Sequence, residues 1–130
     1  MAAYLSSAWF DDLNELARAD VGLRTATAGA RVIIQQVVTG GPAGDVRYWV
    51  RLDDGLVEAA PGEATQADAT VTQSYPTAVA LSRGELRVQD ALLAGQARLT
   101  GDVGALVRHQ AALQAVATAL ATVHSRTTYD

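Results

Sequence analysis

The chain has 130 residues, enough for one domain of ordinary size but not for two. Hydrophobic residues make up 49% of it, which excludes a disordered linker. The net charge of -4, from 10 basic and 14 acidic side chains, argues against nucleic acid or an anionic membrane as the main partner.

Residue types that are missing narrow the chemistry further. There is no cysteine, which excludes disulfides, thiolate nucleophiles and cysteine-bound zinc. The N-terminus has neither the basic start nor the long apolar run of a signal peptide. The longest apolar tract, Leu113 to Val123, is shorter than the roughly 20 residues that a bilayer span requires. We therefore expect a cytoplasmic protein that does not insert stably into a membrane.

Along the chain, the first expected element is a helix over Ser6 to Ala19. Trp9, Leu13 and Leu16 recur there at three- and four-residue spacing, which places them on one face. The next residues, Val21 to Gly29, have weak periodicity and are interpreted as a connecting segment.

Strands follow. Arg31 to Thr39 is short and rich in β-branched residues, and the glycine-rich segment from Gly40 to Asp45 marks a loop. Val46 to Asp53 alternates, with Val46, Tyr48, Val50 and Leu52 on one side and Arg47, Trp49, Arg51 and Asp53 on the other, which is typical of an antiparallel strand with one covered face. On its exposed side Trp49 lies between two arginines, so we expect a guanidinium to stack on its ring.

The alternation continues after an Asp-Asp-Gly turn. Leu56 to Ala60 begins another strand, and Ala67 to Gln73 alternates again, with Ala69 and Val71 inward. Short connections between these strands favour a meander, in which each strand pairs with the next.

The second half turns helical. Two short helices are expected over Ala78 to Arg83 and Val88 to Ala94, each followed by glycine, and then a short strand over Gln96 to Thr100. One long helix should run from Val103 to about Ser125, and the tail from Arg126 to Asp130 should fray. Helices at both ends of a mostly antiparallel sheet predict one α+β domain spanning residues 1–130.

The usual catalytic patterns are missing from the sequence. His109 lies on the polar face of the expected last helix and His124 near the terminus, which favours solvated side chains over a catalytic base. Asp11 and Glu15 share a helix face with Arg18, which favours surface ion pairs over a metal site. We therefore expect no enzyme activity, no metal and no cofactor.

One region does carry a recognisable order of motifs. The segments are Ala67-Asp68-Ala69-Thr70-Val71-Thr72, Gly84-Glu85-Leu86, Ala91-Leu92-Leu93-Ala94-Gly95 and Arg98-Leu99-Thr100-Gly101-Asp102. Their order and spacing resemble the second half of the sterol carrier protein two domain family, in its stand-alone bacterial type. The first half agrees in pattern only, as an entry helix followed by strands that end in Asp-Asp-Gly.

This resemblance implies a five-stranded sheet with helices over one face and an apolar tunnel between the two layers. It implies binding of fatty acids, sterols or other lipids, and no catalytic residues. In the motifs, Gly84, Gly95 and Gly101 are expected to supply turn geometry, and Asp68 and Asp102 to cap or anchor backbone. Alanine, the commonest residue, fits either a closely packed interior or an unfilled cavity that accepts an apolar ligand.

Candidate ligand-binding residues are the apolar, inward positions of the expected strands and helices. They are Leu13, Ile34, Val50, Val71, Val79, Leu92, Leu93, Leu106, Leu113, Val116 and Leu120. Ordinary core packing is the alternative for each of them.

Two other functions stay open. The chain could be an accessory module that uses the same apolar surface to bind a protein partner in lipid or quinone metabolism, with Trp49 or the tail at the contact. It could also be a small enzyme acting on an apolar substrate, for which Tyr48 is the polar-tipped candidate on the covered face.

Overall fold

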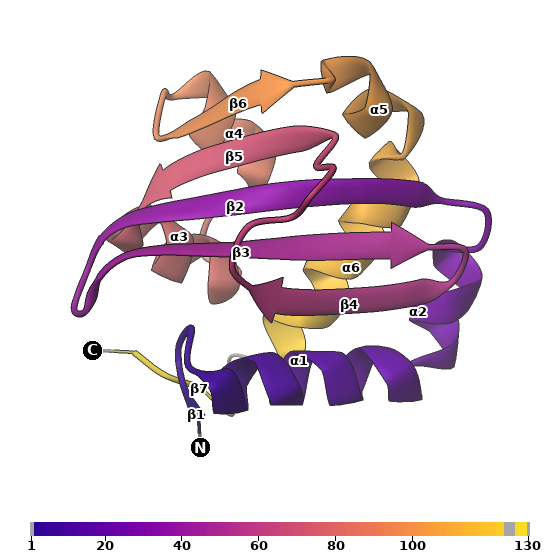
Figure 1. The fold of residues 1–130 in the computed structure, drawn as a ribbon, viewed down its shortest axis with the longest axis horizontal. Coiled ribbons are helices and arrows are strands. Elements are labelled where there is room, and N and C mark those ends of the chain that lie inside the picture. Colours follow the sequence, from indigo (N-terminus) through magenta and orange to yellow (C-terminus); the bar gives the residue numbers. More distant parts are fainter. Residues whose placement is uncertain (1, 124–126, 130) are drawn as a thin grey trace.

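The computed structural model describes residues 2–123 and 127–129, apart from the side chain of Leu120. Five strands form one sheet, and helices cover one of its faces (Figure 1), which confirms the expected α+β architecture. The sheet contains β2 (Arg31–Gly41), β3 (Gly44–Asp53), β4 (Leu56–Pro61), β5 (Ala69–Ser74) and β6 (Ala97–Gly101). The helices are α1 (Ser7–Ala19), α2 (Val21–Ala26), α3 (Tyr75–Ser82), α4 (Val88–Leu93), α5 (Val103–Arg108) and α6 (Gln110–Ala121).

Two tight hairpins join β2, β3 and β4. The first turn needs only Pro42 and Ala43, so the strands extend further into the glycine-rich segment than the sequence indicated. The second turn has Asp54 at φ 48° and Gly55 at φ 91°, the left-handed pair that a two-residue hairpin turn requires. Both pairings are antiparallel, as expected.

The expected meander is wrong at the next strand. β5 does not pair with β4 but lies beside β2, parallel to it, so the strand order is β4-β3-β2-β5-β6. Two side chains secure the crossing segment, residues 62–68. The buried amide of Gln35 bonds to Gly62 O at 3.0 Å and to Ala64 N at 2.7 Å. The Asp68 carboxylate accepts from Ile33 N at 2.7 Å and so fixes the start of β5 against β2.

The N-terminal helices form where local caps begin them. The Ser6 hydroxyl accepts from Trp9 N and starts α1, close to the expected boundary. The segment interpreted as a connection instead holds a second short helix, α2, because Asp20 caps it by accepting from Leu23 N at 3.0 Å. Leu23 is buried, which anchors this helix despite its weak periodicity.

The expected single C-terminal helix is wrong as well. Asp102 caps α5 as expected, but the helix breaks at His109, where φ is -110° and ψ is 20°. A straight helix could not make both sets of contacts, because α5 packs on β5 whereas α6 crosses to α1, α2 and α3. The end of the expected helix, including His124, lies outside the described residues.

Part of the tail is ordered, contrary to expectation. β7 (Thr127–Thr128) pairs in parallel with β1 (Ala2–Ala3), so the two ends of the chain form a small sheet of their own. Thr127 is buried and Tyr129 packs against Tyr4, with ring centroids 5.1 Å apart. These contacts give the tail the partners that a frayed terminus lacks.

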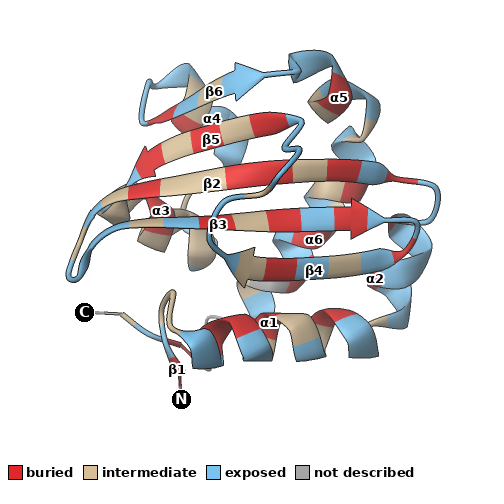
Figure 2. Cartoon of the chain, in the orientation of Figure 1, coloured by how far each residue is buried: buried red, intermediate tan, exposed pale blue. Residues whose placement is uncertain are grey.

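The core lies between the sheet and its helical cover. Buried positions alternate along the central strands (Figure 2), since every second side chain faces the helices. Val32, Val38, Leu52 and Leu13 are among the most completely buried side chains. The charged residues of the strands lie on the opposite, open face of the sheet.

Candidate functional site

The layer between sheet and helices receives most of the predicted ligand-binding residues. Five of them are buried there: Leu13, Ile34, Val50, Val71 and Val116. Four are half-buried: Val79, Leu92, Leu106 and Leu113.

The other two predicted residues are not brought into this layer by the described structure. Leu93 is 88% exposed at the end of α4, so it points away from the core. The side chain of Leu120 lies outside the described residues.

The fully buried residues of the helices α3 to α6 are mostly alanine. In α3, α4 and α5 the buried residue is a single alanine in each helix: Ala78, Ala91 and Ala105. On α6, Ala112 and Ala119 are buried together with Val116. Because a methyl group contributes little buried area, each helix is held to the sheet more weakly than a leucine-faced helix would be.

Aromatic side chains gather at one end of the layer, a feature that the sequence did not indicate. The cluster is made of Tyr4, Trp9, Phe10, Tyr48, Tyr75 and Tyr129. Its members come from the N-terminal segment, α1, β3, α3 and the tail, so only the fold unites them. Tyr4 lies at the centre, 4.9 Å from the Trp9 ring and 5.9 Å from the Tyr75 ring.

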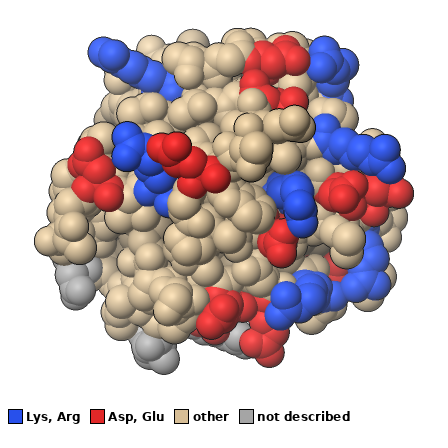
Figure 3. Space-filling view, in the orientation of Figure 1, with Lys and Arg blue, Asp and Glu red and all other residues tan. Residues whose placement is uncertain are grey.

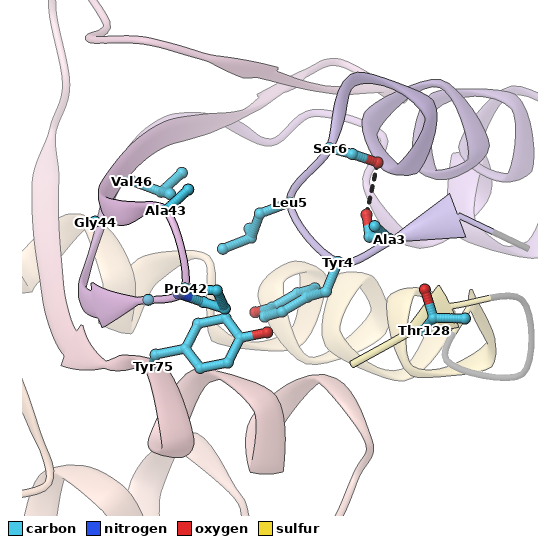
Figure 4. Close-up of a pocket in the computed structure, with 11 residues that line it drawn as sticks. Ala3, Tyr4, Leu5, Ser6, Pro42, Ala43, Gly44, Val46, Tyr75 and Thr128 are labelled. Carbon is cyan, nitrogen blue, oxygen red and sulfur yellow. Dashed lines mark hydrogen bonds between the residues drawn. The ribbon is translucent and has the colours of Figure 1, made fainter. Parts of the chain in front are cut away.

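A cavity of about 270 Å³ opens beside this cluster. The N-terminal segment around Tyr4 and Leu5, the β2–β3 hairpin and Tyr75 form its walls (Figure 4). The hairpin can approach Tyr75 closely because residue 41 is glycine, where a Cβ atom would lie 3.2 Å from the ring carbon Cδ1. None of the predicted ligand-binding residues lines this cavity.

Burial in this region strongly favours neutral side chains. Burial raises the pKa of the Tyr48 hydroxyl far above its ordinary value. Burial also raises the pKa of Tyr4, with smaller contributions from the neighbouring hydroxyls of Tyr48, Tyr129 and Tyr75. Both groups therefore remain protonated, and Tyr48 lies on the covered face as expected.

A row of uncharged polar groups crosses the sheet at the same end. Gln36 and Gln73 occupy inward positions of β2 and β5, and Gln73 Nε2 donates to Gln36 Oε1 at 2.9 Å. Gln36 is the register partner of Tyr48 on β3, and the Tyr48 ring contacts Trp9 at 6.0 Å. The indole N–H of Trp9 is buried, and the described part of the chain offers it no hydrogen-bond acceptor. Among the described residues, it is the one buried polar side-chain group without a partner.

The open face of the sheet has a different character. Charges of both signs are interspersed on it (Figure 3), and Arg51 pairs with Glu58 at 2.6 Å. The Arg51 guanidinium also lies 5.7 Å from the Trp49 ring, which confirms the expected stacking.

A second cavity, of about 310 Å³, lies where residues 62–68 cross this face. Its polar side chains are engaged within the chain, since Gln35 bonds the crossing segment and Arg47 pairs with Glu63 at 3.4 Å.

The side chains that commonly hold metal ions are dispersed. Within residues 2–123 and 127–129, no three His, Cys, Asp or Glu side chains gather in a group that could hold a metal ion.

Comparison with known proteins agrees with this architecture. The sequence profile of the SCP-2 sterol transfer family matches residues 10–114. No match was found among the curated proteins.

Solved structures give the same result at the level of the fold. A possible sterol carrier protein from Thermus thermophilus is 21% identical, with a TM-score of 0.76 over 95% of this chain and 91% of that one. A structure of sterol carrier protein 2 is also 21% identical, with a TM-score of 0.75 over 91% of this chain and 97% of that one. The sec-alkylsulfatase Pisa1 from Pseudomonas sp. is 22% identical, with a TM-score of 0.56 over 78% of this chain but only 15% of its own.

The chain therefore belongs to the SCP-2 sterol transfer family, as the motif order between Ala67 and Leu113 indicated. Across the described part of the chain, none of the helices is both long and apolar enough to cross a membrane.

Proposed function

We propose that this chain binds an apolar ligand between the covered face of its sheet and the helices, and carries it without chemical change. The ligand would be a fatty acid, a sterol-like molecule or another lipid. The observation that carries the proposal is that α3, α4 and α5 each bury a single alanine against the sheet, with half-buried leucines beside these alanines. In α3, α4 and α5 the fully buried side chain is a methyl group, so these helices can separate from the sheet at lower cost than leucine-faced helices and let a ligand take their place. Membership in the SCP-2 family supports the same conclusion.

The apolar layer can supply most of the free energy of such binding. Each buried methylene contributes about 0.8 kcal/mol, so a twelve-carbon chain gains roughly 10 kcal/mol before association and ordering costs. A micromolar dissociation constant corresponds to about 8 kcal/mol net of those costs. Apolar contact is therefore the main source of affinity, and a role without catalysis in the cytoplasm is part of this proposal.

Native mass spectrometry of the freshly purified chain tests the proposal. We expect an added mass that corresponds to a lipid, and displacement of a fluorescent probe when a lipid is titrated. Ala112→Phe, on the covered side of α6, should fill the layer and weaken binding at least tenfold. Ala111→Phe is the matched control, because Ala111 is exposed on the same helix. An unliganded mass together with no probe displacement by any lipid would refute carriage.

A second candidate is an accessory module for a protein partner. Large apolar side chains are exposed on the short helices, with Leu93 88% and Val107 66% exposed. Exposed apolar groups of this size are typical of interaction surfaces when they are contiguous. The double substitution Leu93→Ser and Val107→Ser should then abolish binding to a protein partner while leaving lipid binding intact.

A further inference from the structure

The aromatic end of the layer contains a hydrogen-bond donor that the chain itself does not satisfy. Trp9 is 4% exposed, and its indole N–H has no oxygen or nitrogen acceptor among the described residues. Leaving a buried donor unpaired costs about 1–3 kcal/mol. The Trp9 ring contacts the rings of Tyr4, Phe10 and Tyr48, and aromatic faces are weak acceptors compared with oxygen. A ligand oxygen at this place would recover that energy.

The groups around this donor are polar but uncharged. Tyr48 contacts Trp9 through its ring and is the register partner of Gln36, whose side chain is hydrogen-bonded to that of Gln73. No charged residue occupies an inward position on the five strands, and no charged side chain is buried among the described residues. An ionised carboxylate placed here would lose its hydration without gaining a counter-charge, which costs several kcal/mol.

From these two observations we propose that Trp9, Tyr48 and the Gln36–Gln73 pair form a subsite for the uncharged, oxygen-bearing head of an amphipathic lipid. The subsite selects alcohols, esters or ketones over fatty-acid anions. This inference rests on the proposed lipid carriage and specifies the ligand class, with the apolar tail in the alanine-lined layer.

The N-terminal segment provides the route to this subsite. Tyr4 belongs both to the wall of the 270 Å³ cavity and to the ring contacts of Trp9, so movement of its side chain would join the two. The hydroxyl of Tyr4 is held weakly, since it donates to Ala78 O at 3.3 Å, which is long for this type of bond. Leu5, next to it, has φ 67°, a strained value for a residue other than glycine.

Three ligands with the same twelve-carbon chain test the proposal: 1-dodecanol, methyl dodecanoate and dodecanoate. Their affinities are compared at neutral pH by displacement of the uncharged dye Nile red. We expect the alcohol and the ester to bind at least about tenfold more tightly than the anion, because the anion would lose its hydration in a subsite without a counter-charge. In a Trp49→Phe chain, Trp9 is the sole tryptophan, and its emission should shift on binding of the alcohol.

Two variants test the polar contacts of the subsite. Trp9→Phe keeps an aromatic ring but removes the N–H, and should weaken binding of dodecanol about tenfold, the factor that one hydrogen bond of about 1.4 kcal/mol supplies. Gln73→Leu removes an amide of similar size and should act in the same direction, so the test survives if Trp9→Phe does not fold. Trp49→Phe is the matched control, because Trp49 lies on the open face and its loss should leave the affinity for dodecanol unchanged.

The outcomes separate the two proposals. If none of the three ligands displaces the dye, lipid carriage itself is wrong. If dodecanoate binds as tightly as dodecanol, or if both variants bind dodecanol as tightly as the unaltered chain, carriage stands and the neutral subsite is wrong.

Discussion

Asn14 on α1 forms two hydrogen bonds with the backbone of Ala59 on β4. Its Nδ2 donates to Ala59 O at 2.8 Å and its Oδ1 accepts from Ala59 N at 2.8 Å. One side-chain amide thus supplies the donor and the acceptor that a neighbouring strand would provide. Because β4 is an edge strand, this contact attaches α1 to the sheet and covers part of an edge that could otherwise pair with another chain.

Replacing Asn14 with alanine should therefore destabilise the fold. We expect a loss of about 1–3 kcal/mol in the free energy of unfolding, because two polar groups of Ala59 lose their partners. Urea denaturation measures this loss. Glu15→Ala, one residue further on the exposed side of the same helix, is the control and should change the stability by less than about 0.5 kcal/mol. Equal effects of the two variants would contradict the role given to Asn14.

Glycine at position 101 is required by space as well as by backbone geometry. Its φ is 99°, and a Cβ atom there would lie 2.8 Å from Asp68 O and 3.0 Å from Ala69 Cα. Gly84 has a similar φ of 75° but nothing within 4 Å of the same position. Gly84→Ala should cost about 1–2 kcal/mol from strain alone. Gly101→Ala should cost about 1–3 kcal/mol more, and a thermal melt in which both variants lose the same stability would contradict this.

Alkaline pH should unfold the chain through its buried tyrosines. Burial raises the pKa of Tyr4 and Tyr48 above the unfolded value of about 10, so the folded chain retains protons that the unfolded chain releases. Stability is therefore unaffected below about pH 10 and falls above it, by up to about 1.4 kcal/mol per pH unit for each group. Tyr48→Phe should reduce this slope by about half. Urea denaturation of both chains at about pH 8 and about pH 11 measures the loss of stability between the two pH values. An equal loss in the original chain and in Tyr48→Phe would contradict the role given to Tyr48.

The Asp68 carboxylate should matter more than a carboxylate in a surface ion pair. Asp68→Ala leaves Ile33 N without its acceptor at the start of the parallel pairing and should cost about 1–2 kcal/mol. Asp53→Ala removes only a pair with Arg31, 3.5 Å apart and more than half exposed on both sides, and should cost less than about 0.5 kcal/mol. Chemical denaturation compares the two, and the reverse order would contradict this account of the crossing.

Several details of the site could be predicted because they depend on neighbours along the chain. The alternation from Val46 to Asp53 correctly assigned Tyr48 and Val50 to the covered face. Gln36 and Gln73 were missed because an amide is not expected in an apolar layer, although the alternation from Ala67 gives Gln73 an inward position. Leu92 and Leu93 were both expected in the layer, but neighbouring residues of a helix point about 100° apart, so Leu92 is half-buried whereas Leu93 is 88% exposed.

The sequence by itself determined most of the local elements, the cap at Asp102 and the family, since each depends on residues within a few positions or on their order. The tertiary structure alone decided that β5 lies beside β2, that the helix breaks at His109 and that the termini pair. It also brought Tyr4, Trp9 and Tyr75 together around one cavity. These features arise from contacts between distant parts of the chain, and no local pattern records which of the available apolar faces and strand edges will meet.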